Sequence, residues 1–162
     1  MCLLAVTTMT GFTSCDDDDD NYLKTSQVPE ACVTALQSRY PDATNVRWER
    51  KHKYYVAEFR NVQRDYDVWY AADATWAMTE IDYGKNLFFL PAVVSEAFAT
   101  GEYGTGYTVD DISEYQRPQS TFYEIEVEPQ GGGKDVYLYY DEQGNLFKTS
   151  TIDIDITPDT VL

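Results

Sequence analysis

VPEACVTALQSRY at residues 28–40 has a shorter counterpart in LPAVVSEAF at residues 90–98. Both segments begin with an aliphatic residue and a proline, and both continue with apolar residues at the spacing of an amphipathic helix. Pro29 and Pro91 lie in the first turn, where a helix tolerates proline. The first helix should end near Tyr40, because a proline follows that residue. The sequence therefore predicts one helix of the same design in each half of the chain.

Segments of alternating polarity, bounded by turn residues, follow each predicted helix. In the first half they lie at about 45–50, 54–61, 65–70 and 75–80, and in the second at about 108–116, 121–128, 134–140 and 146–156. The third and fourth segments match best, since WYAADATW at 69–76 aligns with YYDEQGNL at 139–146. Hairpin connections imply antiparallel pairing. We predict an α+β fold of two tandem helix–four-strand repeats, with one antiparallel sheet and both helices on one of its faces.

The N-terminal segment predicts export and lipid attachment. Residues 1–14 have the size of a secretory apolar region, although no Lys or Arg precedes it, so we expect the natural start to lie upstream. FTSC at residues 12–15 resembles a bacterial lipoprotein box, which implies lipidation of Cys15. The acidic run Asp16–Asp20 resembles a surface-export signal and can equally be a solvated tether. We expect a Gram-negative outer-membrane lipoprotein, surface-exposed or periplasmic, with a tether at 15–27 and repeats at 28–89 and 90–157.

Composition excludes several kinds of function. The 162 residues include 28 Asp and Glu against 12 Lys and Arg, for a net charge of −16. That charge repels phosphate backbones, so we expect no nucleic-acid partner. One His and three Cys without zinc spacing predict no metal site, and Asp16–Asp20 lacks the Gly and Glu of a calcium loop. Cys32 on the first helix is expected to be an inert buried thiol. We predict no cofactor and no enzyme activity.

One face of the predicted sheet combines aromatic and acidic side chains. Alternation places the more apolar set of each strand against the helices and leaves the other set on the opposite face. That face collects Tyr54, Glu58, Asp67, Trp69, Glu124, Glu126, Tyr137 and Tyr139. With two helices only, nothing in the chain is expected to cover it, so it should form an exposed contact surface. The alternative is that the aromatic pairs only stabilise a solvated sheet.

Several of these segments together resemble a known family. VPEACVTALQSRYPDATNVRWE, YYVAEF, DYDVWYAADATW, LPAVVSEAF and VYLYYDEQGNL resemble PepSY-like, β-lactamase-inhibitor-protein-like secreted bacterial proteins over about residues 28–150. The resemblance implies tandem helix–four-strand repeats and a role in binding or restraining secreted hydrolases or peptidases.

The sequence alone leaves three functions open. The first is a monomeric lipoprotein, held to the membrane by its lipid only, that modulates a secreted or envelope protein. The second is a surface binder of glycans or peptides, in which the same aromatic side chains stack on sugar rings. The third, which we consider weakest, is a hydrolase that uses Glu58 with Asp67, or Glu124 with Glu126, as paired acids.

Overall fold

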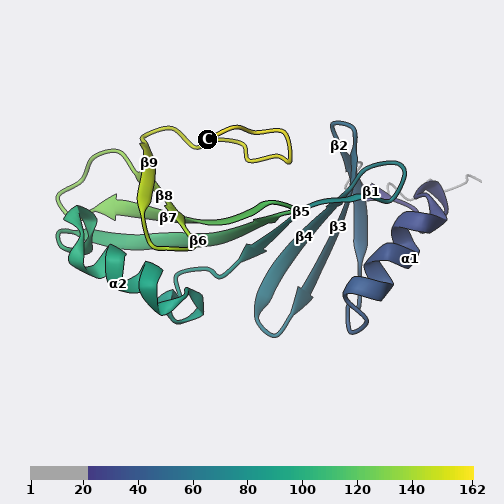
Figure 1. Ribbon diagram of the computed structural model, residues 1–162, viewed down its shortest axis with the longest axis horizontal. Coiled ribbons are helices and arrows are strands. Elements are labelled where there is room, and N and C mark those ends of the chain that lie inside the picture. Colours follow the sequence, from purple (N-terminus) through teal and green to yellow (C-terminus); the bar gives the residue numbers. More distant parts are fainter. Residues whose placement is uncertain (1–21) are drawn as a thin grey trace, which may run out of the picture.

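The computed structural model describes residues 22–162 as a nine-stranded antiparallel sheet with two α-helices (Figure 1). Each strand pairs with the next one along the chain. The strands are β1 (Tyr22–Leu23), β2 (Arg47–Lys51), β3 (Tyr54–Asn61), β4 (Arg64–Tyr70), β5 (Trp76–Asp82), β6 (Tyr107–Arg117), β7 (Ser120–Pro129), β8 (Val136–Asp141) and β9 (Leu146–Ser150). The helices are α1 (Glu30–Arg39) and α2 (Ala92–Thr100). Neither helix of this part of the chain is long and apolar enough to cross a membrane.

The predicted order of elements is confirmed. α1 precedes β2–β5 and α2 precedes β6–β9, and both helices pack on the same face of the sheet, with α2 below β6 and α1 to the right of β2 and β3 in Figure 1. β1 was not predicted. It belongs to the segment expected to be a tether, and it pairs with β2 at the edge of the sheet.

The two repeats share a turn geometry that supports their alignment. Between Trp69 and Tyr70 the β4–β5 register shifts, and the β8–β9 register shifts at the same position between Tyr139 and Tyr140. After each shift a backbone N–H donates back across the turn, from Ala71 to Thr75 over 2.9 Å and from Asp141 to Asn145 over 3.1 Å. The aligned sequences therefore form equivalent β-bulges and turns.

Each helix has its own apolar core on its side of the sheet. Cys32 and Leu36 of α1 pack with Trp48, Phe59 and other buried residues of β2–β4. On the second half of the sheet, Val94 and Phe98 of α2 pack with buried residues of β5–β8. Val93, expected on the same buried face of α2 as Val94 and Phe98, is instead 45% exposed. Burial raises the pKa of the Cys32 thiol, as expected of an inert cysteine.

A third core lies on the opposite face of the sheet, where none was predicted. Ile154, Ile156 and Leu162 pack there against residues of both repeats. The last predicted strand, 146–156, is wrong beyond Ser150, because β9 ends there and residues 151–162 fold back across the sheet instead. We call residues 151–162 the C-terminal strap. It is the yellow segment above the sheet in Figure 1, away from both helices.

Candidate functional site

A band of carboxylates crosses the sheet on the face away from the helices. Cross-strand pairing places Glu58 beside Asp67, and Asp67 beside Glu80, on β3, β4 and β5. On the second repeat, Glu126 of β7 pairs with Asp111 of β6, and Glu124 lies two residues before Glu126 on the same side of the strand. We call this set the acidic face. It consists of Glu49, Glu58, Asp67, Glu80, Asp111, Glu124 and Glu126.

The aromatic side chains of this face are not exposed, which corrects the sequence prediction. Tyr54 is 6% exposed, Trp69 is 3% exposed and Tyr139 is fully buried. The prediction assumed that nothing covers the sheet here, whereas the C-terminal strap packs on these rings. Tyr137 stays half-buried at the margin of the strap. The rings are therefore core residues, and the carboxylates around them are half-buried.

Polar contacts hold the strap at two places. Arg117 of β6 donates two hydrogen bonds of 2.8 Å, to the carbonyl oxygens of Thr157 and Thr160. At the other place Asp159 accepts a hydrogen bond of 3.0 Å from the Tyr54 hydroxyl and pairs with the Lys53 ammonium at 2.9 Å. A pocket of about 310 Å³ lies between strap and sheet. Its lining includes Lys51, Trp69, Glu80, Tyr115, Asp153 and Asp155.

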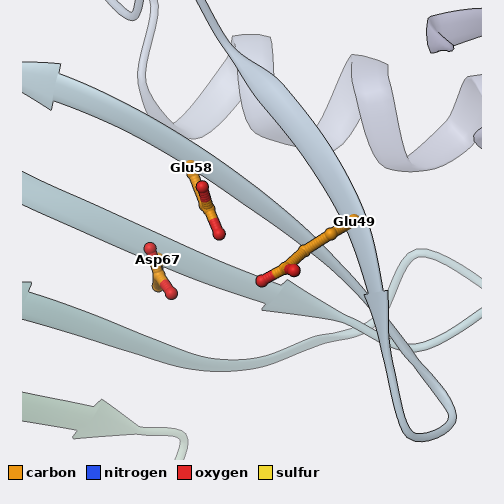
Figure 2. Close-up of side chains that lie close together, drawn as sticks. All are labelled: Glu49, Glu58 and Asp67. Atoms are coloured by element: carbon orange, nitrogen blue, oxygen red, sulfur yellow. The ribbon is translucent and has the colours of Figure 1, made fainter. Parts of the chain in front are cut away.

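Three acids of the first repeat converge closely enough to suggest a metal site. Glu49, Glu58 and Asp67 each offer an oxygen within 4.8 Å of the others (Figure 2). The Lys51 ammonium already occupies this position, at 2.5 Å from Glu49, 3.1 Å from Asp67 and 3.7 Å from Glu58. Burial disfavours the charged ammonium, but the contacts to Glu49 and Asp67 outweigh it and raise the pKa of Lys51 above its usual range. The cluster is thus an internal ion-pair network, with the lysine in the place of a metal ion.

The remaining acids of the face have no such partner. Within residues 22–162, no Lys or Arg forms an ion pair with Glu80, Asp111, Glu124 or Glu126. Burial and the negative charge of Asp67 raise the pKa of Glu80 to about 7, although Tyr115 donates a hydrogen bond to it over 3.1 Å. In the described part of the chain these acids therefore lack a paired cation that would lower their pKa values.

The second repeat shows the same effect. Burial, followed by the charges of Asp153 and Glu126, raises the pKa of Glu124 to about 7. Burial and the charge of Asp82 raise the pKa of Asp111 to about 6. A positively charged group placed over these side chains would restore their ordinary pKa values, and this is the binding chemistry that the face offers.

The structure brings the acidic residues of the predicted site onto one face, with Glu58 and Asp67 in one repeat and Glu124 and Glu126 in the other. Sequence reasoning missed Glu80, Asp111 and Lys51. Glu80 could have been found from the alternation of the strand at 75–80, in which it lies on the same face as Met78. Cys15 lies outside the described residues.

Comparisons with known proteins place this architecture in a family. The family described as "Putative beta-lactamase-inhibitor-like, PepSY-like" matches residues 17–65 and 53–148, which together extend over both repeats. The chain is similar to a BLIP-like protein of Bacteroides fragilis, with 36% identity over 87% of this chain and 97% of that one, at a TM-score of 0.72.

Two further solved structures have the same fold. A DUF2874 family protein of Bacteroides ovatus is 28% identical over 76% of this chain and 86% of its own, at a TM-score of 0.69. A Bacteroides eggerthii protein described as periplasmic is 28% identical over 76% of this chain and 88% of its own, at a TM-score of 0.68. No curated protein matches the chain. With both repeats matched and the fold shared, the chain belongs to the PepSY-like, beta-lactamase-inhibitor-like family.

Proposed function

We propose that this protein is a non-catalytic binding protein of the cell envelope, which restrains a secreted or envelope protein by docking a basic surface of that partner on the acidic face. The observation that supports this proposal most directly is a group of carboxylates on one face that, within residues 22–162, have no cationic partner: Glu80, Asp111, Glu124 and Glu126. The family's inhibitor-like description and the periplasmic description of the Bacteroides eggerthii relative support this role and place.

The net negative charge of the protein should also affect the rate at which a basic partner associates. The net charge of −16 attracts a basic partner over long range, and the unpaired acids hold it in one orientation. Association should therefore slow steeply with added salt, because ions screen exposed charges beyond about 10 Å at 0.1 M ionic strength. The lipid on Cys15 would keep the protein at the membrane, with Asp16–Asp20 as its spacer.

Catalysis fits the face poorly. A pair of acids that cleaves a bond needs a pocket that excludes water and orients the substrate. The pocket under the strap is lined by Glu80 but by neither Glu124 nor Glu126. Glu58 and Asp67 line a pocket on the first repeat, but both are paired with Lys51. Sugar stacking is also disfavoured, because it requires an open ring face and Trp69 and Tyr139 have none.

The test compares two triple variants with the same change in charge. Glu80→Gln, Glu124→Gln and Glu126→Gln neutralise three of the four unpaired acids of the acidic face. Glu96→Gln, Glu102→Gln and Glu142→Gln neutralise exposed acids on α2, the segment after it and the β8–β9 turn.

Each protein, with the wild type, is crosslinked to envelope and culture extracts, and the captured proteins are identified by mass spectrometry. We expect a saturable basic partner to be captured by the wild type and by the control variant, and to be lost with the face variant. Equal capture by both variants would refute docking on the acidic face.

A further inference from the structure

The C-terminal strap resembles a bound peptide more than a part of the sheet. The backbone–backbone hydrogen bond found within residues 151–162 runs from Thr160 to Thr157, so the strap is not a tenth strand. It is attached by side chains, with Ile156 buried in the core that contains the aromatic rings of the sheet and Ile154 packed against that core. Between them Asp155 points away, with 84% of its side chain exposed. The surface thus accepts an extended chain with aliphatic side chains two residues apart.

The negative charges of the strap are electrostatically unfavourable over the acidic face beneath it. Asp153 lies close enough to Glu124 and Glu126 for its negative charge to raise the pKa of both carboxyl groups, after the effect of burial. Asp153 and Asp155 also line the pocket that contains Glu80. Within residues 22–162, none of Glu124, Glu126 and Asp153 forms an ion pair with a cation, and Lys51, which lines the same pocket, is already engaged by Glu49 and Asp67. The strap therefore combines good apolar contacts with like-charge repulsion.

We propose that the strap is a built-in, displaceable occupant of a peptide-binding groove, and that the groove's external ligand is an extended segment of a partner protein with alternating aliphatic and basic residues. Such a segment keeps the positions of Ile154 and Ile156 and replaces the carboxylates of Asp153 and Asp155 by cations. This inference rests on the proposed function and specifies the partner's chemistry at the same face.

The charges of the strap and of the sheet beneath it indicate which kind of peptide would bind in place of the strap. Replacing an aspartate by a lysine at the place of Asp153 turns repulsion from Glu124 and Glu126 into attraction, while the apolar contacts to Trp69 and Tyr139 stay the same. An acidic or uncharged segment gains nothing over the strap, which has the advantage of being part of the same chain. A basic segment is therefore the kind of ligand that can compete with the strap for this site.

Two of the contacts that hold the strap are at the surface. Asp159 pairs with Lys53, and Asp155 approaches His52 at 3.8 Å, so displacement has to overcome mainly the Arg117 hydrogen bonds and the apolar contacts. Exposed ion pairs of this kind contribute little to stability. Release of the strap would uncover Trp69, Tyr54 and Tyr139 together, and these are the aromatic types that dominate binding at protein interfaces.

A peptide titration tests the proposal on residues 21–162 with the strap in place. The probe is the synthetic heptapeptide TIKIKIT. Its controls are TIDIDIT, the sequence of residues 151–157, and TKKIIIT, which has the probe's composition without the alternation. Methyl NMR signals of Ile154 and Ile156 report on the strap. We expect TIKIKIT to bind at least 10-fold more tightly than either control and to shift both signals toward those of an unstructured chain.

Asp153→Lys supplies the matched variant. It gives the strap the proposed ligand's charge, so we expect a higher melting temperature and at least 10-fold weaker binding of TIKIKIT. Glu142→Lys makes the same charge change in the β8–β9 turn and should leave the affinity within about 2-fold.

Equal binding of TIKIKIT and TKKIIIT, binding without movement of the strap signals, or unchanged binding to the Asp153→Lys variant would each overturn the groove proposal. In those cases a partner that is still lost with the acidic-face glutamine variant would leave the proposed function intact, so the two failures can be told apart.

Discussion

Arg117 of β6 donates a hydrogen bond of 2.8 Å to the carbonyl oxygen of Thr160, which lies 43 residues later in the chain. Its second terminal nitrogen donates equally to Thr157. One guanidinium group thus closes the end of the C-terminal strap, while Ile156 anchors its middle in the apolar core. The strap connects both repeats on the face that their helices leave open.

Removing this contact should loosen the strap before the rest of the fold. Hydrogen bonds to a charged group contribute about 1.5–3 kcal/mol each, and water can replace part of them once the strap lifts. We therefore expect Arg117→Ala to lower the free energy of unfolding by about 2 kcal/mol in urea titrations. Limited proteolysis should cut between 150 and 157 faster than in the wild type.

Arg60→Ala is the control for that variant, because the Arg60 side chain is 71% exposed and its pairing with Asp65 lies at the surface. Its effect should stay within about 0.5 kcal/mol. If both arginine variants unfold at the same urea concentration and the strap is cut equally slowly, the guanidinium does not hold the strap.

Trp69→Ala should destabilise the whole domain. The indole is buried among Val56, Met78 and the strap, so truncation leaves a large cavity and costs about 3–5 kcal/mol. Tyr137→Ala removes a half-buried ring at the margin and should cost about 1 kcal/mol. Urea unfolding followed by circular dichroism measures both. Similar costs for the two variants would mean that the strap does not bury Trp69 in solution.

The difference between these two aromatic residues shows how far the sequence could predict the site. Alternation assigned Trp69 and Tyr137 to the correct face of the sheet, because side-chain direction along a strand depends on local geometry alone. Their exposure depends on a segment more than ten residues distant. TIDIDIT at residues 151–157 alternates like a strand, and the local pattern of such a segment is the same whether it pairs with β8 or crosses the sheet.

The repeats were more predictable, since their signals are local. A proline before each helix and the matched turns at 69–76 and 139–146 determine the order of elements and the hairpin geometry. The role of Lys51 was not predictable, because its contacts with Glu49, Glu58 and Asp67 come from three adjacent strands whose register only the fold defines.

Lys51→Met should destabilise the first repeat at neutral pH and less so in acid. Without the ammonium, Glu49, Glu58 and Asp67 repel one another, so their pKa values rise in the folded state. A raised carboxyl pKa gives stability at low pH that is lost as pH increases. We expect the free energy of unfolding, measured in urea, to decrease by about 2 kcal/mol at pH 7 and by clearly less at pH 4. A loss of equal size at both pH values would exclude an electrostatic role for Lys51.

The wild type should lose stability between pH 5 and pH 8. The pKa values of Glu80 and Glu124 rise from 4.5 to about 7 in the folded state, mainly through burial. Their protonated forms therefore favour folding below the unfolded pKa, and this contribution disappears as pH increases through about 7. The carboxyl group of Asp159 has a lowered pKa, so its contribution to stability is lost only in more acidic solution.

Glu80→Gln isolates one part of this dependence. Glutamine keeps the shape and cannot ionise, so the variant should be less sensitive to pH by on the order of 1–2 kcal/mol between pH 5 and pH 8. The measurement is the free energy of unfolding at several pH values for both proteins. Parallel curves would show that Glu80 titrates normally in the folded protein.

The last prediction concerns equivalent turn positions in the two repeats. Gly144 has a φ of +80°, and a Cβ there would meet the carbonyl oxygen of Val93 in α2 at 2.7 Å. Ala74, at the matching place in the first repeat, has a φ of +67° and keeps its side chain. We expect Gly144→Ala to cost about 2 kcal/mol, since backbone strain and the close approach of α2 add together. Ala74→Gly should change stability by less than about 1 kcal/mol, because relief of strain offsets the added freedom of the unfolded chain.

Gly144→Asn separates the two causes at that position. Asparagine tolerates a positive φ but still has a Cβ, so its cost should stay close to that of alanine if the contact with Val93 dominates. Thermal unfolding of the three variants beside the wild type measures these differences. A small cost for Asn with a large cost for Ala would assign the effect to backbone conformation, and α2 would then lie further from the β8–β9 turn than the structure places it.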